Sequence, residues 1–112
     1  TQLTLANELK RVINVHFADD IAHNTAVSSA VATATATDAA TARTLANALK
    51  AAYNTHLAAA NVHFTNDGTN TIAAADSTDA ATLQTLVNEL RTDVTAHMLS
   101  APVGVYVNMV DA

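Results

Sequence analysis

Hydrophobic positions recur with helical spacing in three separate stretches of the chain. In the first stretch one helical face carries Leu5, Leu9, Val12, Ile13, His16 and Phe17. The second stretch places Leu45, Leu49, Ala52, Tyr53, His56 and Leu57 on that face, and the third places Leu86, Leu90, Val94, His97 and Met98 there. The pattern predicts helices at 2–19, 38–59 and 79–99, with N-caps at Thr37 or Asp38 and at Thr78 or Asp79.

The three helices belong to an internal repeat. The recurring text reads TLANELK at 4–10, TLANALK at 44–50 and TLVNELR at 85–91. The histidines keep the same register, because His16, His56 and His97 match one another and His23 matches His63. A period of roughly 40 residues indicates repeat units at 2–37, 38–78 and 79–100 within one domain, 1–112.

The two linkers between the helices are long for a compact bundle. About 17 extended residues reach more than 50 Å, whereas an 18-residue helix is only about 27 Å long. Residues 30–37 also alternate with a two-residue period, which favours extended backbone. We therefore expect each linker to return along its helix, which gives a mainly α three-helix repeat bundle with parallel helices. An antiparallel up-and-down bundle with loose loops is the alternative.

A different pattern follows the third helix. After Pro102 the alternating positions of the segment 101–112 are Val103, Val105, Val107 and Met109. This two-residue period predicts a β-strand that lies outside the repeat units. Because a lone strand is unstable in water, we expect it to pair with a neighbouring subunit as an assembly strand. The extended segment 27–35 of the same chain is the alternative partner.

Composition and charge exclude several classes of protein. The chain has 26 Ala and 17 Thr but no Cys, so it holds neither a disulfide scaffold nor a cysteine-ligated metal. Its five Lys and Arg residues are scattered and the net charge is −5, which argues against nucleic-acid binding. No apolar run approaches the roughly 20 residues of a membrane helix. The serines lack a nucleophile elbow, and two glycines make no phosphate loop, so we expect neither an enzyme nor a cofactor.

The histidines are the main candidates for chemistry. The spacing of His56, His63 and Asp67 would supply three zinc ligands, but Val27 stands where Asp67 would recur in the first repeat. We therefore interpret the histidines as structural and metal-free, with rings that donate to free carbonyls at the helix ends. Asn14 and Asn54 are expected to close the loops that follow them. The histidines in question are His16, His23, His56, His63 and His97.

The sequence of the repeats also resembles that of known proteins. The matching residues are 44–54, His56, Val62-His63 and 75–82, with weaker copies at 4–23 and 85–97. It resembles Ala/Thr-rich helical repeat proteins found among the virion-structural proteins of tailed bacteriophages. The resemblance implies a capsid decoration, cement or tail-associated component, made in the host cytoplasm and located in the virion. Its partners would be itself, as a homo-oligomer, and other virion proteins. The alternatives are a metal-binding or pH-sensing helical module, or a subunit of a cellular surface layer or extracellular filament.

Overall fold

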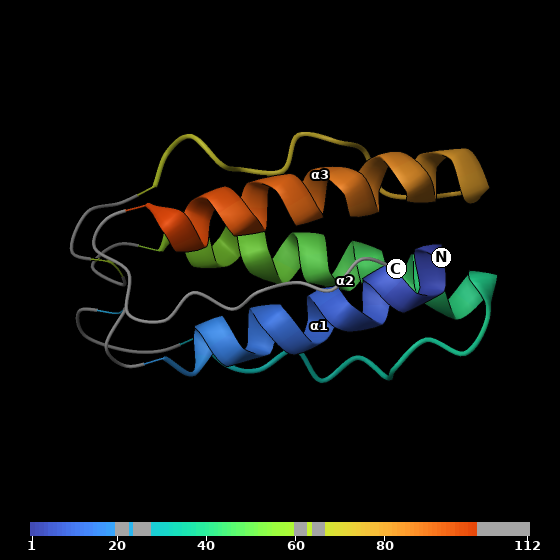
Figure 1. Ribbon diagram of the computed structural model, residues 1–112, viewed down its shortest axis with the longest axis horizontal. Helices are drawn as coiled ribbons and strands as arrows, with labels where there is room; N and C mark the ends of the chain where they lie inside the picture. The colour runs from blue at the N-terminus through green and yellow to red at the C-terminus, as the bar shows by residue number, and fades with distance from the viewer. Residues whose placement is uncertain (20–22, 24–27, 60–62, 64–66, 101–112) are drawn as a thin grey trace.

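Three helices lie side by side and run in the same direction in the computed structural model, which describes residues 1–19, 23, 28–59, 63 and 67–100 (Figure 1). They are α1 (Gln2–Phe17), α2 (Ala39–Ala58) and α3 (Ala80–Leu99). At one end of the bundle, Gln2 Nε2 donates to the Ala80 carbonyl over 2.8 Å. At the other end, the Nε2 atoms of His16 and His97 are 2.9 Å apart. The expected parallel arrangement is therefore the one observed.

The helix starts are fixed by side chains that bind free backbone N–H groups. Asp38 and Asp79 form capping boxes with Thr41 and Thr82, in which each side chain bonds the other residue's backbone N–H. Thr1 caps α1 in a simpler way, by accepting from the N–H of Thr4. The predicted helices are confirmed to within two residues at every end.

An extended segment returns along α1, where two asparagines hold it. The Val31 N–H donates to Asn14 Oδ1 over 2.7 Å, and Asn14 Nδ2 donates back to the Val31 carbonyl over 3.2 Å. Asn7 holds Ala36 in the same way, over 2.7 and 3.0 Å. Each amide therefore satisfies both polar groups of one residue, as a neighbouring strand would.

The segment after α2 repeats this arrangement. Asn54 binds the N–H and carbonyl of Ile72 over 2.8 and 3.0 Å, and Asn47 binds those of Ser77 over 2.7 and 3.1 Å. The loop-closing role predicted for Asn14 and Asn54 is confirmed.

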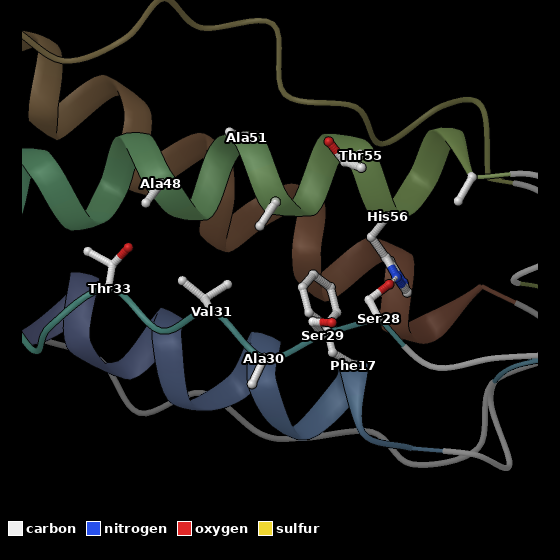
Figure 2. Close-up of a pocket in the computed structure, with 12 residues that line it drawn as sticks. Phe17, Ser28, Ser29, Ala30, Val31, Thr33, Ala48, Ala51, Thr55 and His56 are labelled. Atoms are coloured by element: carbon white, nitrogen blue, oxygen red, sulfur yellow. Dashed lines mark hydrogen bonds between the residues drawn. The ribbon is translucent and has the colours of Figure 1, made fainter.

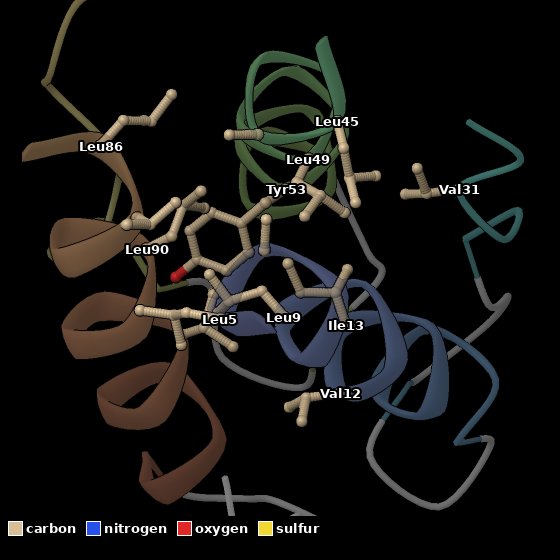
Figure 3. Close-up of a cluster of buried hydrophobic side chains, with 14 of the residues drawn as sticks. Leu5, Leu9, Val12, Ile13, Val31, Leu45, Leu49, Tyr53, Leu86 and Leu90 are labelled. Atoms are coloured by element: carbon tan, nitrogen blue, oxygen red, sulfur yellow. The ribbon is translucent and has the colours of Figure 1, made fainter. Parts of the chain in front are cut away.

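The core is built from the predicted helical faces (Figure 3). All of their members are buried except Ala52, which is partly buried. In the returning segments the buried positions are five residues apart, at Val31 and Ala36 and again at Ile72 and Ser77. Burial in these extended segments therefore does not follow a two-residue period, because they pack on helices and not in a sheet.

The described residues contain no β-strand. The predicted C-terminal strand, with Val103, Val105, Val107 and Met109, lies outside them. None of the helices within the described part of the chain combines the length and the apolar character needed to cross a membrane.

Candidate metal centre

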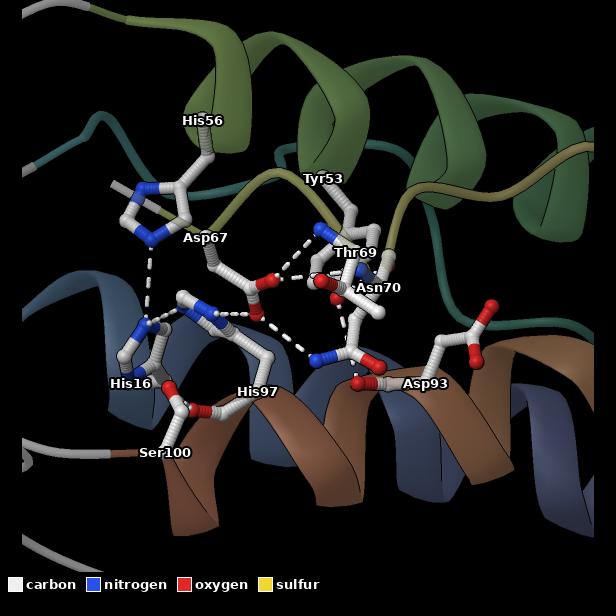
Figure 4. A network of polar contacts seen from close by, with 9 residues as sticks. All are labelled: His16, Tyr53, His56, Asp67, Thr69, Asn70, Asp93, His97 and Ser100. Carbon is white, nitrogen blue, oxygen red and sulfur yellow. Dashed lines mark hydrogen bonds and ion pairs between the residues drawn. The ribbon is translucent and has the colours of Figure 1, made fainter. Parts of the chain in front are cut away.

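Each helix carries one histidine in its last turn, and the parallel arrangement brings the three rings together. His16, His56 and His97 are 3%, 1% and 1% exposed. The Nε2 atom of His16 lies 3.0 Å from Nε2 of His56 and 2.9 Å from Nε2 of His97 (Figure 4). The Nε2 atom of His16 thus meets one Nε2 atom from each of the other two helices.

Two further histidines from the linkers complete this cluster. His23 and His63 are both buried, and their ring centroids are 5.0 Å apart. His23 lies 4.8 Å from the His16 ring, and His63 lies 4.6 Å from the His56 ring. One ring nitrogen from each of four residues fits within 4.8 Å of the others, namely His16, His23, His56 and His63. We call all five histidines together the histidine cluster.

Hydrogen bonds at the rim of the cluster orient the rings. His97 Nδ1 donates to Asp67 Oδ2 over 2.9 Å, and His23 Nδ1 donates to the Asp19 carbonyl over 2.5 Å. His56 Nδ1 lies 2.7 Å from Ser28 Oγ. With the Nδ1 proton engaged outside, the Nε2 atoms of His23 and His97 present lone pairs. Ligating histidines are oriented in this way by a second layer of hydrogen bonds.

Asp67 owes its position to a tight turn. Its Oδ1 accepts from the N–H groups of Thr69 and Asn70 over 3.0 and 3.1 Å, and Oδ2 accepts from Asn70 Nδ2 over 2.8 Å. Burial alone would raise the pKa of Asp67, but the hydrogen bonds from Asn70, Thr69 and His97 outweigh it and hold the pKa at about 2. A full negative charge therefore lies beside the cluster.

The rings of His16, His56, His63 and His97 are held neutral. Burial is the main cause, and repulsion between the crowded rings adds to it. Together they lower the pKa of His16 to about 3, of His56 to about 2 and of His63 to about 4. The pKa of His97 is also lowered, although Asp67 opposes the shift. Neutral imidazole is the form that binds a metal ion.

The cluster has more close contacts between ring nitrogens than it has protons to form hydrogen bonds in them. His16 Nε2 faces two other Nε2 atoms, and a neutral His16 carries one proton, which serves only one of them. Four buried nitrogens in the described residues have no hydrogen-bond partner: His16 Nδ1, His23 Nε2 and both nitrogens of His63. Each unsatisfied buried group costs about 1–3 kcal/mol.

The surface reaches the cluster through a hollow between the first returning segment and α2 (Figure 2). It has a volume of about 610 Å³, and Phe17, Ser28 and His56 line its inner end. The hollow therefore reaches the edge of the cluster at His56.

The predictions for the site residues are partly corrected. The rings of His16, His56 and His97 meet one another, whereas we expected them to donate to carbonyls of the helix ends. Among the three zinc candidates, His56 and His63 do lie together, but Asp67 binds His97. Neither Asp67 nor His97 belongs to the group of four histidines whose ring nitrogens lie within 4.8 Å of one another. The cluster was not predicted from the sequence, because the candidate ligands His56, His63 and Asp67 all lie within one repeat. The signal was the shared register, which parallel helices convert into one cluster.

Comparisons with known proteins found no match. No protein-family model, curated protein or solved structure matches the chain. The histidine cluster is therefore the feature that bears on function.

Proposed function

We propose that this protein is a metal-binding helical module, in which the histidine cluster holds one divalent first-row transition ion. The ion joins the C-terminal ends of the three helices and both linkers, so its role is to fasten the fold. The observation that carries the proposal is the crowding of buried ring nitrogens. His16 Nε2 lies within 3.0 Å of the Nε2 atoms of His56 and His97, and one ring nitrogen from each of His16, His23, His56 and His63 lies within 4.8 Å of the others. A cation is the partner that uses all of these lone pairs at once.

The donor atoms narrow the class of ion. Imidazole nitrogen suits zinc, copper, nickel, cobalt and iron, whereas calcium, magnesium and manganese prefer oxygen ligands. Bonds of about 2.0–2.1 Å to one central ion would separate tetrahedral nitrogens by about 3.3 Å. The observed contacts of 2.9 and 3.0 Å need only a small expansion to reach that spacing. Asp67 supplies a nearby negative charge that offsets part of the ion's charge.

A structural ion acts on stability through mass action. Because the cluster joins residues far apart in the chain, the unfolded chain binds the ion weakly. An ion at 100 times its dissociation constant adds about 2.7 kcal/mol of stability. For a domain of this size the increase in melting temperature is about 10 °C or more.

Thermal unfolding by circular dichroism tests the proposal. We expect EDTA to lower the melting temperature of the purified protein and zinc to restore it, the opposite of what metal-free histidines predict. His56→Gln should abolish the zinc-dependent rise. Leu57→Ala is the matched control, since it opens a cavity beside the cluster, at a cost of about 2–4 kcal/mol, but keeps every donor. An equal response to zinc in the wild type and in His56→Gln would refute the proposal.

The virion role stays a separate prediction that rests on the resemblance alone. A metal-fastened helical module is compatible with a capsid or tail component that acts by self-association, and with a surface-layer subunit. Mass spectrometry of purified phage particles tests the virion role: peptides of this chain at high copy number support it, and their absence from particles of the encoding phage contradicts it.

A further inference from the structure

The two returning segments are held by the same asparagine clamps, in which one side-chain amide binds both backbone groups of a residue. Val31 in the first segment therefore corresponds to Ile72 in the second, since equivalent asparagines clamp them. The backbone also bends at corresponding positions, Thr33 and Ala74. The surroundings of the two segments can thus be compared position by position.

A carboxylate from α3 binds the second segment just after its first clamp. One oxygen of Glu89 accepts from the N–H of Ala73 over 2.8 Å, and the other accepts from the N–H of Ala74 over 3.0 Å. The repeat register places Glu8 at this position in the first helix, but Ala48 in the second. The carboxylate that joins the second segment to α3 therefore has no counterpart in α2.

The N–H groups that such a carboxylate would bind are left without a protein partner. They belong to Ala32 and Thr33, which correspond to Ala73 and Ala74. Within the described part of the chain, no group accepts a hydrogen bond from either N–H. Adjacent backbone N–H groups that point at one place form a binding site for an anion. The first segment therefore offers a pair of donors that the second segment uses to bind a carboxylate.

The hollow beside α2 lies next to these donors. Thr33 and Ala48 line it from opposite sides (Figure 2). It follows α2 from Ala48 to His56, a distance of about 12 Å along the helix. Its volume of about 610 Å³ falls within the range of sites for small molecules. Most of its lining is apolar, and comes from Phe17, Ala30, Val31, Ala51, Ala52 and Ala59.

We propose that this hollow binds a small carboxylate that carries an aliphatic chain. The carboxylate accepts from the N–H groups of Ala32 and Thr33, as Glu89 does in the second segment, and the chain lies along the alanines of α2 towards Phe17. A compact anion such as phosphate would leave the apolar walls uncovered, which favours a ligand with an apolar body. The inference goes beyond the proposed metal binding and does not depend on it, because the two donors lie outside the histidine cluster.

Titration of the ¹⁵N-labelled full chain with sodium octanoate, followed by NMR, tests the proposal. The amide signals of Ala32 and Thr33 should shift and saturate, whereas those of Ala73 and Ala74, which already bond Glu89, should stay in place. Octanol lacks the carboxylate and acetate lacks the chain, so each should bind about tenfold more weakly or worse. The absence of a saturable shift, or equal affinity for octanol or for acetate, would overturn the proposal.

Ala48→Glu gives a second test, because it supplies from α2 the carboxylate that α3 already provides. This variant should no longer respond to octanoate, and its melting temperature should rise by about 4 °C or more as the new side chain bonds the two N–H groups. Ala81→Glu is the matched control, since it makes the same substitution at an exposed position of α3 outside the hollow. The control should bind octanoate within about twofold of the wild type. Undiminished binding by Ala48→Glu, or an equal loss in both variants, would overturn the proposal.

Discussion

Replacing Asp67 by asparagine tests whether hydrogen bonds at the rim orient the rings for the proposed metal binding. The carboxylate accepts four hydrogen bonds, two on each oxygen, and one of them comes from His97 Nδ1. Asparagine keeps only one oxygen, so its NH₂ group must face two of these donors. If it faces Thr69 and Asn70, the turn opens, and if it faces His97, the ring of His97 must change its tautomer.

The change of tautomer has a direct consequence for metal binding. His97 would carry its proton on Nε2, where the lone pair otherwise faces the cluster. Loss of such an outer partner weakens metal binding about 10- to 100-fold. That loss corresponds to about 1.4–2.7 kcal/mol of binding free energy.

Isothermal titration with zinc, in competition with a chelator of known affinity, measures the effect. Asp76→Asn is the matched control, because it removes the same charge from an exposed side chain that pairs with Lys50 over 3.0 Å. Its zinc affinity should stay within about twofold of the wild type, since exposed charges act weakly. Equal zinc affinity in Asp67→Asn and the wild type would refute the role of Asp67. Equal losses of zinc affinity in Asp67→Asn and Asp76→Asn would show that Asp67 acts only through its negative charge and not by orienting His97.

Two further predictions concern stability. Asn54→Ala removes both bonds to Ile72 and should cost about 1–3 kcal/mol in urea unfolding, whereas the exposed Thr55→Ala should cost less than about 0.5 kcal/mol; equal costs would contradict the clamp. The second prediction concerns pH and is measured in EDTA. Because the pKa values of His16, His56 and His63 are lowered in the folded protein, the unfolded chain binds protons at a higher pH than the folded protein does. Stability is therefore full above about pH 6.5 and lost as the pH falls towards 4. Equal melting temperatures at pH 8 and pH 5 would contradict the burial of neutral rings.

The helices could be predicted because local sequence signals mark them, and their direction could be predicted from the length of the linkers. The apolar faces follow the helical period, and Asp38 and Asp79 mark the starts with residues that bind free N–H groups. The length of the linkers relative to the helices favoured parallel packing, which the contacts at both ends of the bundle confirm.

The histidine cluster could not be predicted from spacing alone. Its donors come from separate repeats, so no single stretch shows the pattern of a ligand set. Only the three-dimensional contacts reveal that His16 meets both His56 and His97, and that His97 relies on Asp67. The burial pattern of the returning segments was equally hidden, since it depends on which helix surface they cover.

Metal analysis of the purified protein tests the central claim most directly. The protein should be isolated without chelator or affinity resin, incubated with a slight excess of zinc, desalted and measured by inductively coupled plasma mass spectrometry. We predict about one ion per chain, with X-ray absorption showing nitrogen ligands at about 2.0–2.1 Å. His16→Gln with His56→Gln should retain far less than the wild type. A buried histidine site should be nearly saturated with zinc under these conditions. A zinc content of the wild type below roughly a tenth of an ion per chain would therefore contradict the proposed metal site.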